Sequence, residues 1–123
     1  MDNSFSVVQF DTEEPTTSEK SGLPKVELTD LLGCEKLHAR VWYLSPGDSI
    51  VYHKHREQEE VYVPLNGPGQ LRIGGELVDV PANAAVRVSP ETPRQPVNTS
   101  DDEHVWLIVG APSVDDDGIS IDD

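Results

Sequence analysis

The sequence predicts an all-β fold, either a sandwich or a closed barrel of short strands. From Leu37 onward, stretches rich in β-branched and aromatic residues recur at short intervals, and turns rich in glycine and proline separate them. No segment shows the long helical spacing of apolar residues that an amphipathic helix requires. A chain of 123 residues is long enough for one domain and too short for two ordinary ones.

Residues 1–36 are expected to form an N-terminal arm with a short strand and a linker. Residues 4–10 contain Phe5, Val7 and Val8 and predict the strand. Residues 11–22 are polar and include a proline, which predicts the linker. Residues 24–34 are compatible with a strand or with a helical turn.

Residues 37–112 are expected to form the barrel. The clearest hairpin is centred on Gly74-Gly75, because two glycines tolerate the positive φ angles of a tight turn. Its pairing places Leu71 and Val78 on one face, and residues 90–96 are expected to be a loop. The acidic residues 113–123 are expected to be a disordered tail. The predicted strands, in order, are residues 38–44, 49–55, 60–65, 70–73, 76–80, 84–88 and 105–109.

The net charge of the chain is strongly negative. Nine Lys and Arg against 23 Asp and Glu give a formal charge of −14. Such a surface repels phosphate backbones, so no nucleic-acid partner is expected. A salt-rich cytoplasm would screen the repulsion among these carboxylates, which favours an origin in a halophilic microbe. The alternative is an acidic mesophilic protein with a solvated surface.

The cysteine content and the hydropathy of the chain predict a cytoplasmic protein. Cys34 is the only cysteine, so no disulfide can form within the chain. No apolar run approaches the ~20 residues that span a membrane, so no membrane partner is expected. The first residues lack the basic start and the apolar stretch of a signal peptide.

Two histidines, His53 and His55, are the first candidate metal ligands. Residues i and i+2 share a face on a strand, whereas on a helix they would lie about 200° apart. Glu60 begins the next expected strand, which would return antiparallel within about 5 Å of the histidines. Two imidazoles and one carboxylate suit Fe, Mn, Ni or Zn. The alternative is a pair of polar histidines at a solvent-exposed strand end.

The spacing around these three residues resembles the first motif of the cupin family. Gly47, five residues, His53-x-His55, four residues, Glu60, six residues and Gly67 match every defining position. The resemblance covers residues 37–112 and implies a double-stranded β-helix, or jelly-roll barrel, that is often dimeric. It also implies that His53, His55 and Glu60 point into the barrel and bind a divalent metal ion. Residues 5–10 form an apolar segment that the core does not need, and we expect a homodimer in which this segment crosses to the sheet edge of the partner.

The second cupin motif is degraded in this chain. Only Asn98 remains of its usual residues, and Arg94 stands where the family has a fourth metal-binding histidine. Arginine cannot ligate a metal, and a monocation ~5 Å from a dication repels it by roughly 6–7 kcal/mol at an effective dielectric near 20.

Three arrangements would relieve the repulsion between a metal and Arg94. Arg94 points out of the barrel, or an anionic ligand lies between the metal and the guanidinium, or the metal is absent and Arg94 pairs with Glu60. The second makes Arg94 a substrate-binding residue, because arginine binds carboxylate and phosphate in a bidentate manner.

Three functions are compatible with this sequence. The first is a metalloenzyme, such as an isomerase or a dioxygenase, that acts on a small anionic or oxygenated molecule. The second is a non-catalytic binding or sensing barrel without metal, and the third is a structural barrel with relic histidines. No general acid or base is identifiable, so the catalytic residues are unassigned, and the fold alone does not choose a reaction. Neither His38 nor His104 is expected to be a ligand.

Overall fold

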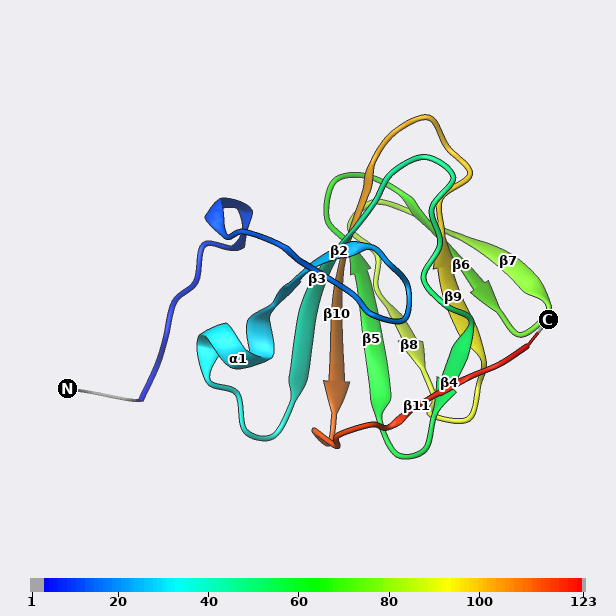
Figure 1. Cartoon of the computed structure of the whole chain (residues 1–123). Helices are drawn as coiled ribbons and strands as arrows, with labels where there is room; N and C mark the ends of the chain where they lie inside the picture. The colour runs from blue at the N-terminus through cyan, green and yellow to red at the C-terminus, as the bar shows by residue number, and fades with distance from the viewer. Residues whose placement is uncertain (1–3, 123) are drawn as a thin grey trace.

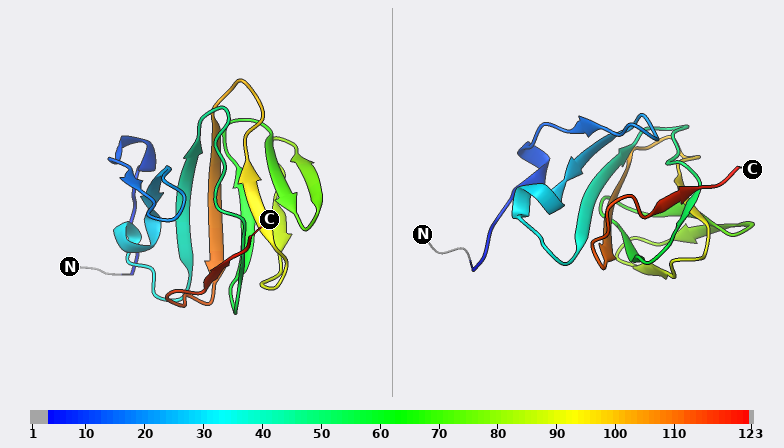
Figure 2. Two further views of the ribbon diagram at one scale, coloured as in Figure 1. Left: turned by 45° about the vertical axis from the view of Figure 1, so that its right-hand side comes forward. Right: turned by 60° about the horizontal axis from the view of Figure 1, so that its bottom comes forward.

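The computed structural model describes residues 4–122, which form two antiparallel β-sheets that close into a barrel (Figures 1 and 2). The first sheet has the strand order β1-β2-β3-β10-β5-β8, and the second has the order β11-β4-β9-β6-β7. The predicted all-β, double-stranded β-helix is therefore confirmed. The strands are β1 Thr16–Thr17, β2 Pro24–Glu27, β3 His38–Leu44, β4 His53–His55, β5 Glu59–Pro64, β6 Gly69–Ile73, β7 Glu76–Val80, β8 Val86–Val88, β9 Arg94–Val97, β10 His104–Ala111 and β11 Gly118–Ser120.

Strand β10 is the centre of the first sheet and pairs with both β3 and β5. Every second residue of β10 is buried, as expected for a strand with one face toward a core. Trp106 lies opposite Trp42 on β3, and Ile108 lies opposite Tyr62 on β5. The barrel core is apolar and contains Leu23, Trp42, Leu44, Ile50, Tyr62, Leu71, Val80, Val88, Trp106 and Ile108.

The hairpin of β6 and β7 forms as the sequence predicts. Ile73 pairs with Glu76 across the two glycines, and Gly74 has a φ of 59°, which glycine adopts without strain. Leu71 lies opposite Val78, and both pack in the barrel core. Strand β7 of this hairpin is one edge of the second sheet, and β11 is the other edge.

A second apolar cluster lies on the outer face of β3 and β10. The segment of residues 24–34 contains both elements compatible with its sequence, strand β2 and then helix α1, Leu28–Leu32. Gly33 ends the helix in a left-handed conformation with a φ of 75°. Leu28 of the helix packs with Val41 of β3. None of the helices in the described residues has the length and apolar composition to cross a membrane.

The expected strand at residues 4–10 is wrong. These residues pair with no strand among the described residues, and a short 3₁₀ helix, η1 (Phe10–Thr12), follows them. The side chains of Phe5 and Val7 are 73% and 85% exposed. Apolar composition alone does not make a strand, because the backbone also needs a neighbouring sheet edge for its hydrogen bonds.

Two further expectations for the barrel need correction. Residues 90–96 are not wholly a loop, because β9 begins at Arg94 and pairs with β6. The strand expected at residues 49–55 is shorter, since β4 spans only His53–His55. Proline-rich sequence conceals the start of β9, because proline is depleted in strands, yet Pro96 lies inside β9 opposite Leu71.

The acidic tail is ordered where disorder is expected. Strand β11 pairs with β4 in register, with Gly118 opposite His55 and Ser120 opposite His53. The backbone N–H of Ile121 donates to the carbonyl of Tyr52 over 2.9 Å. Backbone pairing with an open sheet edge, which composition does not reveal, orders this acidic segment. Residues 1–3 of the arm and residue 123 of the tail lie outside the described residues.

Candidate functional site

A pocket of about 460 Å³ lies between β3 of the first sheet and β4 of the second. Residues 17–21 of the N-terminal arm and residues 116–118 and 120 of the tail line it. A smaller cavity of about 20 Å³ shares part of this wall and adds Glu60 and Tyr62. The polar residues of the larger pocket that matter for its chemistry are Lys25, His38, Arg40, His53, His55, Gln58 and Asp117.

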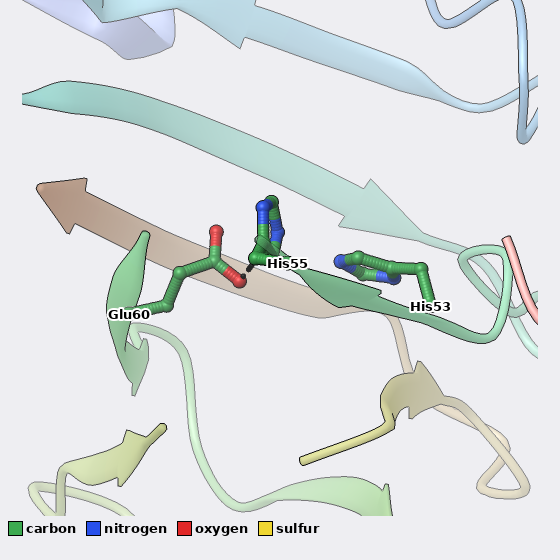
Figure 3. A group of neighbouring side chains, drawn as sticks. All are labelled: His53, His55 and Glu60. Atoms are coloured by element: carbon green, nitrogen blue, oxygen red, sulfur yellow. Dashed lines mark ion pairs between the residues drawn. The ribbon is translucent and has the colours of Figure 1, made fainter. Parts of the chain in front are cut away.

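The structure brings together the three metal ligands expected from the sequence (Figure 3). His53 and His55 stand two residues apart on β4, and their ring centroids are 5.1 Å apart. Glu60 lies on β5 and is 1% exposed. One ligand atom from each residue lies within 4.8 Å of the others. Strand periodicity therefore directs both imidazoles toward the same carboxylate.

The hydrogen bonds of the two imidazoles leave their Nε2 atoms as the candidate ligand atoms. The Nδ1 atom of His53 lies 2.8 Å from the carbonyl oxygen of Val51, and a carbonyl only accepts, so Nδ1 carries the proton. The Nδ1 atom of His55 lies 3.1 Å from Asp117 Oδ2. The Nε2 atom of His55 is buried, and its close polar neighbour among the described residues is Glu60 Oε1 at 3.2 Å. Metal-binding histidines typically use this arrangement of a second nitrogen bonded to a carboxylate or carbonyl.

The charge state of His53 favours metal binding. Burial lowers the pKa of His53 to about 4, although its hydrogen bond to Val51 and the negative charge of Glu60 act in the opposite direction. His53 is therefore neutral at pH 7, as a ligand imidazole must be.

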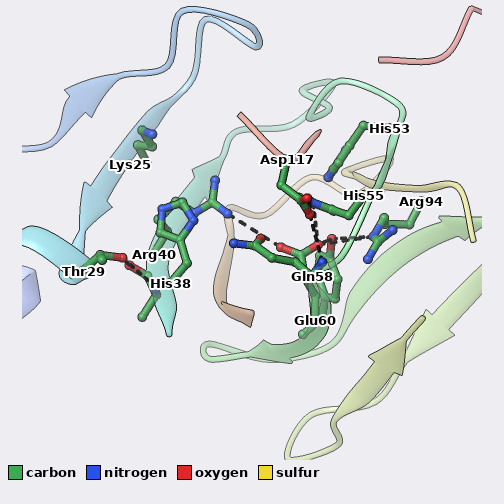
Figure 4. Close-up of polar contacts among 12 residues, drawn as sticks. Lys25, Thr29, His38, Arg40, His53, His55, Gln58, Glu60, Arg94 and Asp117 are labelled. Atoms are coloured by element: carbon green, nitrogen blue, oxygen red, sulfur yellow. Dashed lines mark hydrogen bonds and ion pairs between the residues drawn. The ribbon is translucent and has the colours of Figure 1, made fainter. Parts of the chain in front are cut away.

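The carboxylate of Glu60 contacts four polar side chains of the site (Figure 4). The hydroxyl of Tyr62 donates to its Oε1 over 2.7 Å, and His55 Nε2 lies 3.2 Å from the same oxygen. Arg94 Nε lies 3.3 Å from Oε1, and Arg40 Nη2 lies 3.6 Å from Oε2. Burial by itself raises the pKa of Glu60, but His55, Arg94 and Tyr62 outweigh it and lower the pKa to about 2.

Arg94 pairs with Glu60, which is the contact that the third of the arrangements considered from the sequence contains. Its side chain is fully buried, so it does not point out of the barrel. Its Nη1 donates to the carbonyls of Pro90 and Thr92 over 3.1 and 2.8 Å, and its Nε donates to the hydroxyl of Tyr62. Arg94 lines neither cavity. The structure therefore does not bring the predicted substrate-binding residue to the pocket wall.

Arg40 lines both cavities, and the sequence reasoning missed it. Arg40 lies on the same face of β3 as His38 and Trp42, which also line the larger pocket. The available signal is a cation in the middle of the apolar strand HARVWYL. A charged residue at an alternating position with apolar neighbours indicates an inward-facing group.

Asp117 is the second missed residue, and it comes from the acidic tail. It is 4% exposed and accepts hydrogen bonds from the backbone N–H groups of Glu57 and Gln58 as well as from His55. Burial alone raises the pKa of Asp117, but these hydrogen bonds outweigh it, so the pKa is lowered. Asp117 thus fixes both the ring of His55 and the turn between β4 and β5.

The formal charges of the site balance without a metal. Two guanidinium groups, Arg40 and Arg94, offset the carboxylates of Glu60 and Asp117 when the histidines are neutral. A divalent ion would leave an excess charge of about +2 in a buried environment, which is unfavourable unless an anion binds with it. The donor atoms therefore fit a divalent metal that binds together with an anionic ligand.

Comparison with known proteins identifies a family and a curated relative of this chain. The family model described as the Cupin domain matches residues 40–110. The curated oxalate-binding protein of Thermotoga maritima is 36% identical over 78 residues, which cover 59% of this chain and 63% of that protein. The match spans less than two thirds of the length of that relative.

Solved structures show the same fold. The polyketide cyclase RemF from Streptomyces resistomycificus superposes with a TM-score of 0.81 at 19% identity, covering 95% of this chain and 85% of the other. A predicted oxalate decarboxylase from Thermotoga maritima gives a TM-score of 0.75 at 20% identity, covering 88% of this chain and 100% of the other. The Cupin domain model covers more than half of the sequence, and the barrel carries the family's His-His-Glu cluster; the chain therefore belongs to the cupin family.

Proposed function

We propose that this protein binds a divalent metal ion, Fe, Mn, Ni or Zn, through His53, His55 and Glu60, and that a small anionic or oxygenated molecule binds beside it. The observation that carries this proposal is the convergence of His53, His55 and Glu60, with ligand atoms within 4.8 Å of one another and His55 Nε2 directed at Glu60 Oε1 while its Nδ1 bonds to Asp117. Two imidazoles and one carboxylate are a ligand set for these metals, and a carboxylate bonded to the second nitrogen of one imidazole is typical of metal-binding histidines.

The charge of the site supports an anionic ligand. A metal dication would leave the cluster with about two excess positive charges, and a dianion would neutralise them. Arg40 lines the pocket and would face this ligand directly. Arg94 would act only through Glu60, which it holds from behind the pocket wall. The relative named oxalate-binding protein makes a small carboxylate the first class to test.

Metal content and metal affinity test this proposal. We expect protein purified without an affinity tag to contain close to one metal ion per chain by elemental analysis. In calorimetric titration with Zn²⁺, His55→Ala should weaken binding at least 100-fold, about 2.8 kcal/mol, because one of three ligands is lost. The matched control is His104→Ala, a buried histidine whose Nε2 contacts Ser100 outside the site, and its affinity should stay within about threefold. Equal affinities in the two variants would refute the proposed ligand set.

The second candidate function is a non-catalytic binding or sensing cupin without metal. Its support is the pairing of Glu60 with Arg94 and Arg40, which already compensates the carboxylate. The same experiment separates the two functions. A metal-free binder would contain no ion and would bind oxalate equally well with and without a chelator. A metal-dependent isomerase or dioxygenase would be the catalytic form of the first proposal, in which the ion polarises a substrate oxygen.

We also propose that the protein is a homodimer in which the N-terminal segment crosses to a sheet edge of the partner. Its support is the exposure of Phe5 and Val7 and the course of the N-terminal segment, which extends away from the barrel (Figure 1). Removing residues 1–9 should convert the dimer to a monomer, because the apolar contact is lost. Light scattering measures the mass. Replacing the exposed Leu77 by serine is the control and should leave the dimer intact, whereas a truncated protein of unchanged dimeric mass would contradict the crossing segment.

A further inference from the structure

Several buried polar atoms on one wall of the pocket lack a partner. Gln58 is 1% exposed, yet neither its amide nitrogen nor its amide oxygen makes a hydrogen bond within the described residues. The Nε atom of Arg40 is also buried and makes no hydrogen bond to any residue in the described part of the chain. Both residues line the pocket, one from the turn between β4 and β5 and the other from β3. Figure 4 shows the amide of Gln58 between the guanidinium of Arg40 and the imidazole of His55.

Gln58 has little freedom to turn elsewhere for a partner. Its backbone N–H donates to Asp117 Oδ2 over 2.9 Å, which fixes the start of the side chain. A Cβ atom at Gly110 would lie only 3.2 Å from Gln58 Oε1, so the amide fills the space above that glycine. A buried amide without a partner destabilises a folded protein. Native proteins retain such groups where they serve a purpose other than stability.

The chemistry of the unpartnered atoms defines what a ligand must offer. Arg40 Nε–H and the Gln58 amide N–H₂ are donors, and together they suit the two oxygens of a carboxylate. The Gln58 amide oxygen is an acceptor and needs a ligand hydrogen-bond donor. Oxalate and malonate, when fully ionised, offer only acceptors. A carboxylate with a neighbouring hydroxyl satisfies all three groups.

We propose that Arg40 and Gln58 form a specificity subsite that selects a small hydroxycarboxylate over the corresponding simple carboxylate. This inference rests on the proposed metal-dependent binding of an anion, and it names the residues that recognise the ligand. Arg40 binds the carboxylate and sets affinity for the charge. Gln58 accepts from the hydroxyl and sets the preference for it.

The first test needs no ligand. In the metal-free protein, Gln58→Met removes the unpartnered amide and keeps a side chain of similar length. We expect the melting temperature to rise by roughly 3–6 °C. The control is Gln70→Met, because the Gln70 amide oxygen accepts from the backbone and hydroxyl of Thr99, and its loss should lower the melting temperature or leave it unchanged. A lower melting temperature in Gln58→Met would mean that the amide has a partner in the protein, and would overturn the inference.

The second test compares tartronate and malonate, two dianions that differ by one hydroxyl. In the Zn²⁺-loaded protein, calorimetry should show at least tenfold tighter binding of tartronate. Gln58→Met should reduce this preference to less than threefold and leave the Zn²⁺ affinity unchanged. Arg40→Met should weaken both dianions by a similar factor, and Gln70→Met should change neither.

The outcomes separate this inference from the proposed function. Failure of the wild-type protein to bind Zn²⁺ would refute the proposed metal site. If Gln58→Met binds Zn²⁺ and still prefers tartronate, the metal and not Gln58 recognises the hydroxyl. That result would overturn only the role of Gln58. Zn²⁺ binding without measurable affinity for either dianion would overturn the subsite.

Discussion

Replacing Arg94 by methionine is expected to lower the free energy of unfolding of the metal-free protein by about 3–5 kcal/mol. The guanidinium is fully buried and lies 3.3 Å from Glu60 Oε1, and Glu60 is only 1% exposed. Removing one partner of such a pair leaves a buried carboxylate with less compensation, although Arg40 and Tyr62 remain in contact with it. Urea denaturation at neutral pH in the presence of a chelator measures the loss.

The same substitution is expected to strengthen Zn²⁺ binding at least tenfold, about 1.4 kcal/mol. Arg94 and a metal ion are alternative partners of the same carboxylate, and the guanidinium repels a dication held by Glu60. The control is Arg87→Met, because Arg87 pairs with Glu59 on the exposed surface. It should change stability by less than about 1 kcal/mol and leave metal affinity unaltered. Unchanged Zn²⁺ affinity in Arg94→Met would show that the guanidinium does not compete with the ion.

Lowering the pH is expected to remove a contribution of roughly 3 kcal/mol that ionised Glu60 makes to stability. The pKa of Glu60 is about 2 in the folded protein, against a value near 4.5 for an ordinary glutamate. A carboxyl whose pKa is lower in the folded state stabilises that state above the unfolded pKa. The contribution is complete above about pH 4.5 and is lost as the pH falls toward 2.

Urea denaturation of the metal-free protein from pH 7 to pH 2.5 measures this loss. The stability of Glu60→Gln should fall less steeply over that range than the stability of the wild type, because its side chain does not titrate. Glu59→Gln is the control, since the neighbouring Glu59 is largely exposed on the barrel surface, and its pH profile should follow the wild type. Parallel profiles for wild type and Glu60→Gln would contradict the stabilising role of the ionised carboxylate.

Local periodicity was enough to predict the all-β class and the convergence of His53 and His55, and the motif spacing that resembles the cupin family added the double-stranded β-helix. Alternation along β10 and the two glycines between β6 and β7 are properties of neighbouring residues, and the structure has both elements. The convergence of His53 and His55 follows from the same period of two along β4. Glu60 joins them because it begins the strand that follows a short turn. Each of these features is encoded within about ten residues, so the sequence pattern contains it.

Tertiary structure alone decided what surrounds this cluster. His55 and Asp117 are 62 residues apart in the sequence, and the contact exists because β11, the edge strand of the second sheet, pairs with β4. Composition predicted disorder for that tail, since its backbone pairing leaves no pattern in the side chains. The direction of Arg94, toward Glu60 and away from the pocket, depends on acceptors supplied by Tyr62 and Pro90. Contacts between distant segments are set by how the sheets close, and no local pattern of residues records that closure.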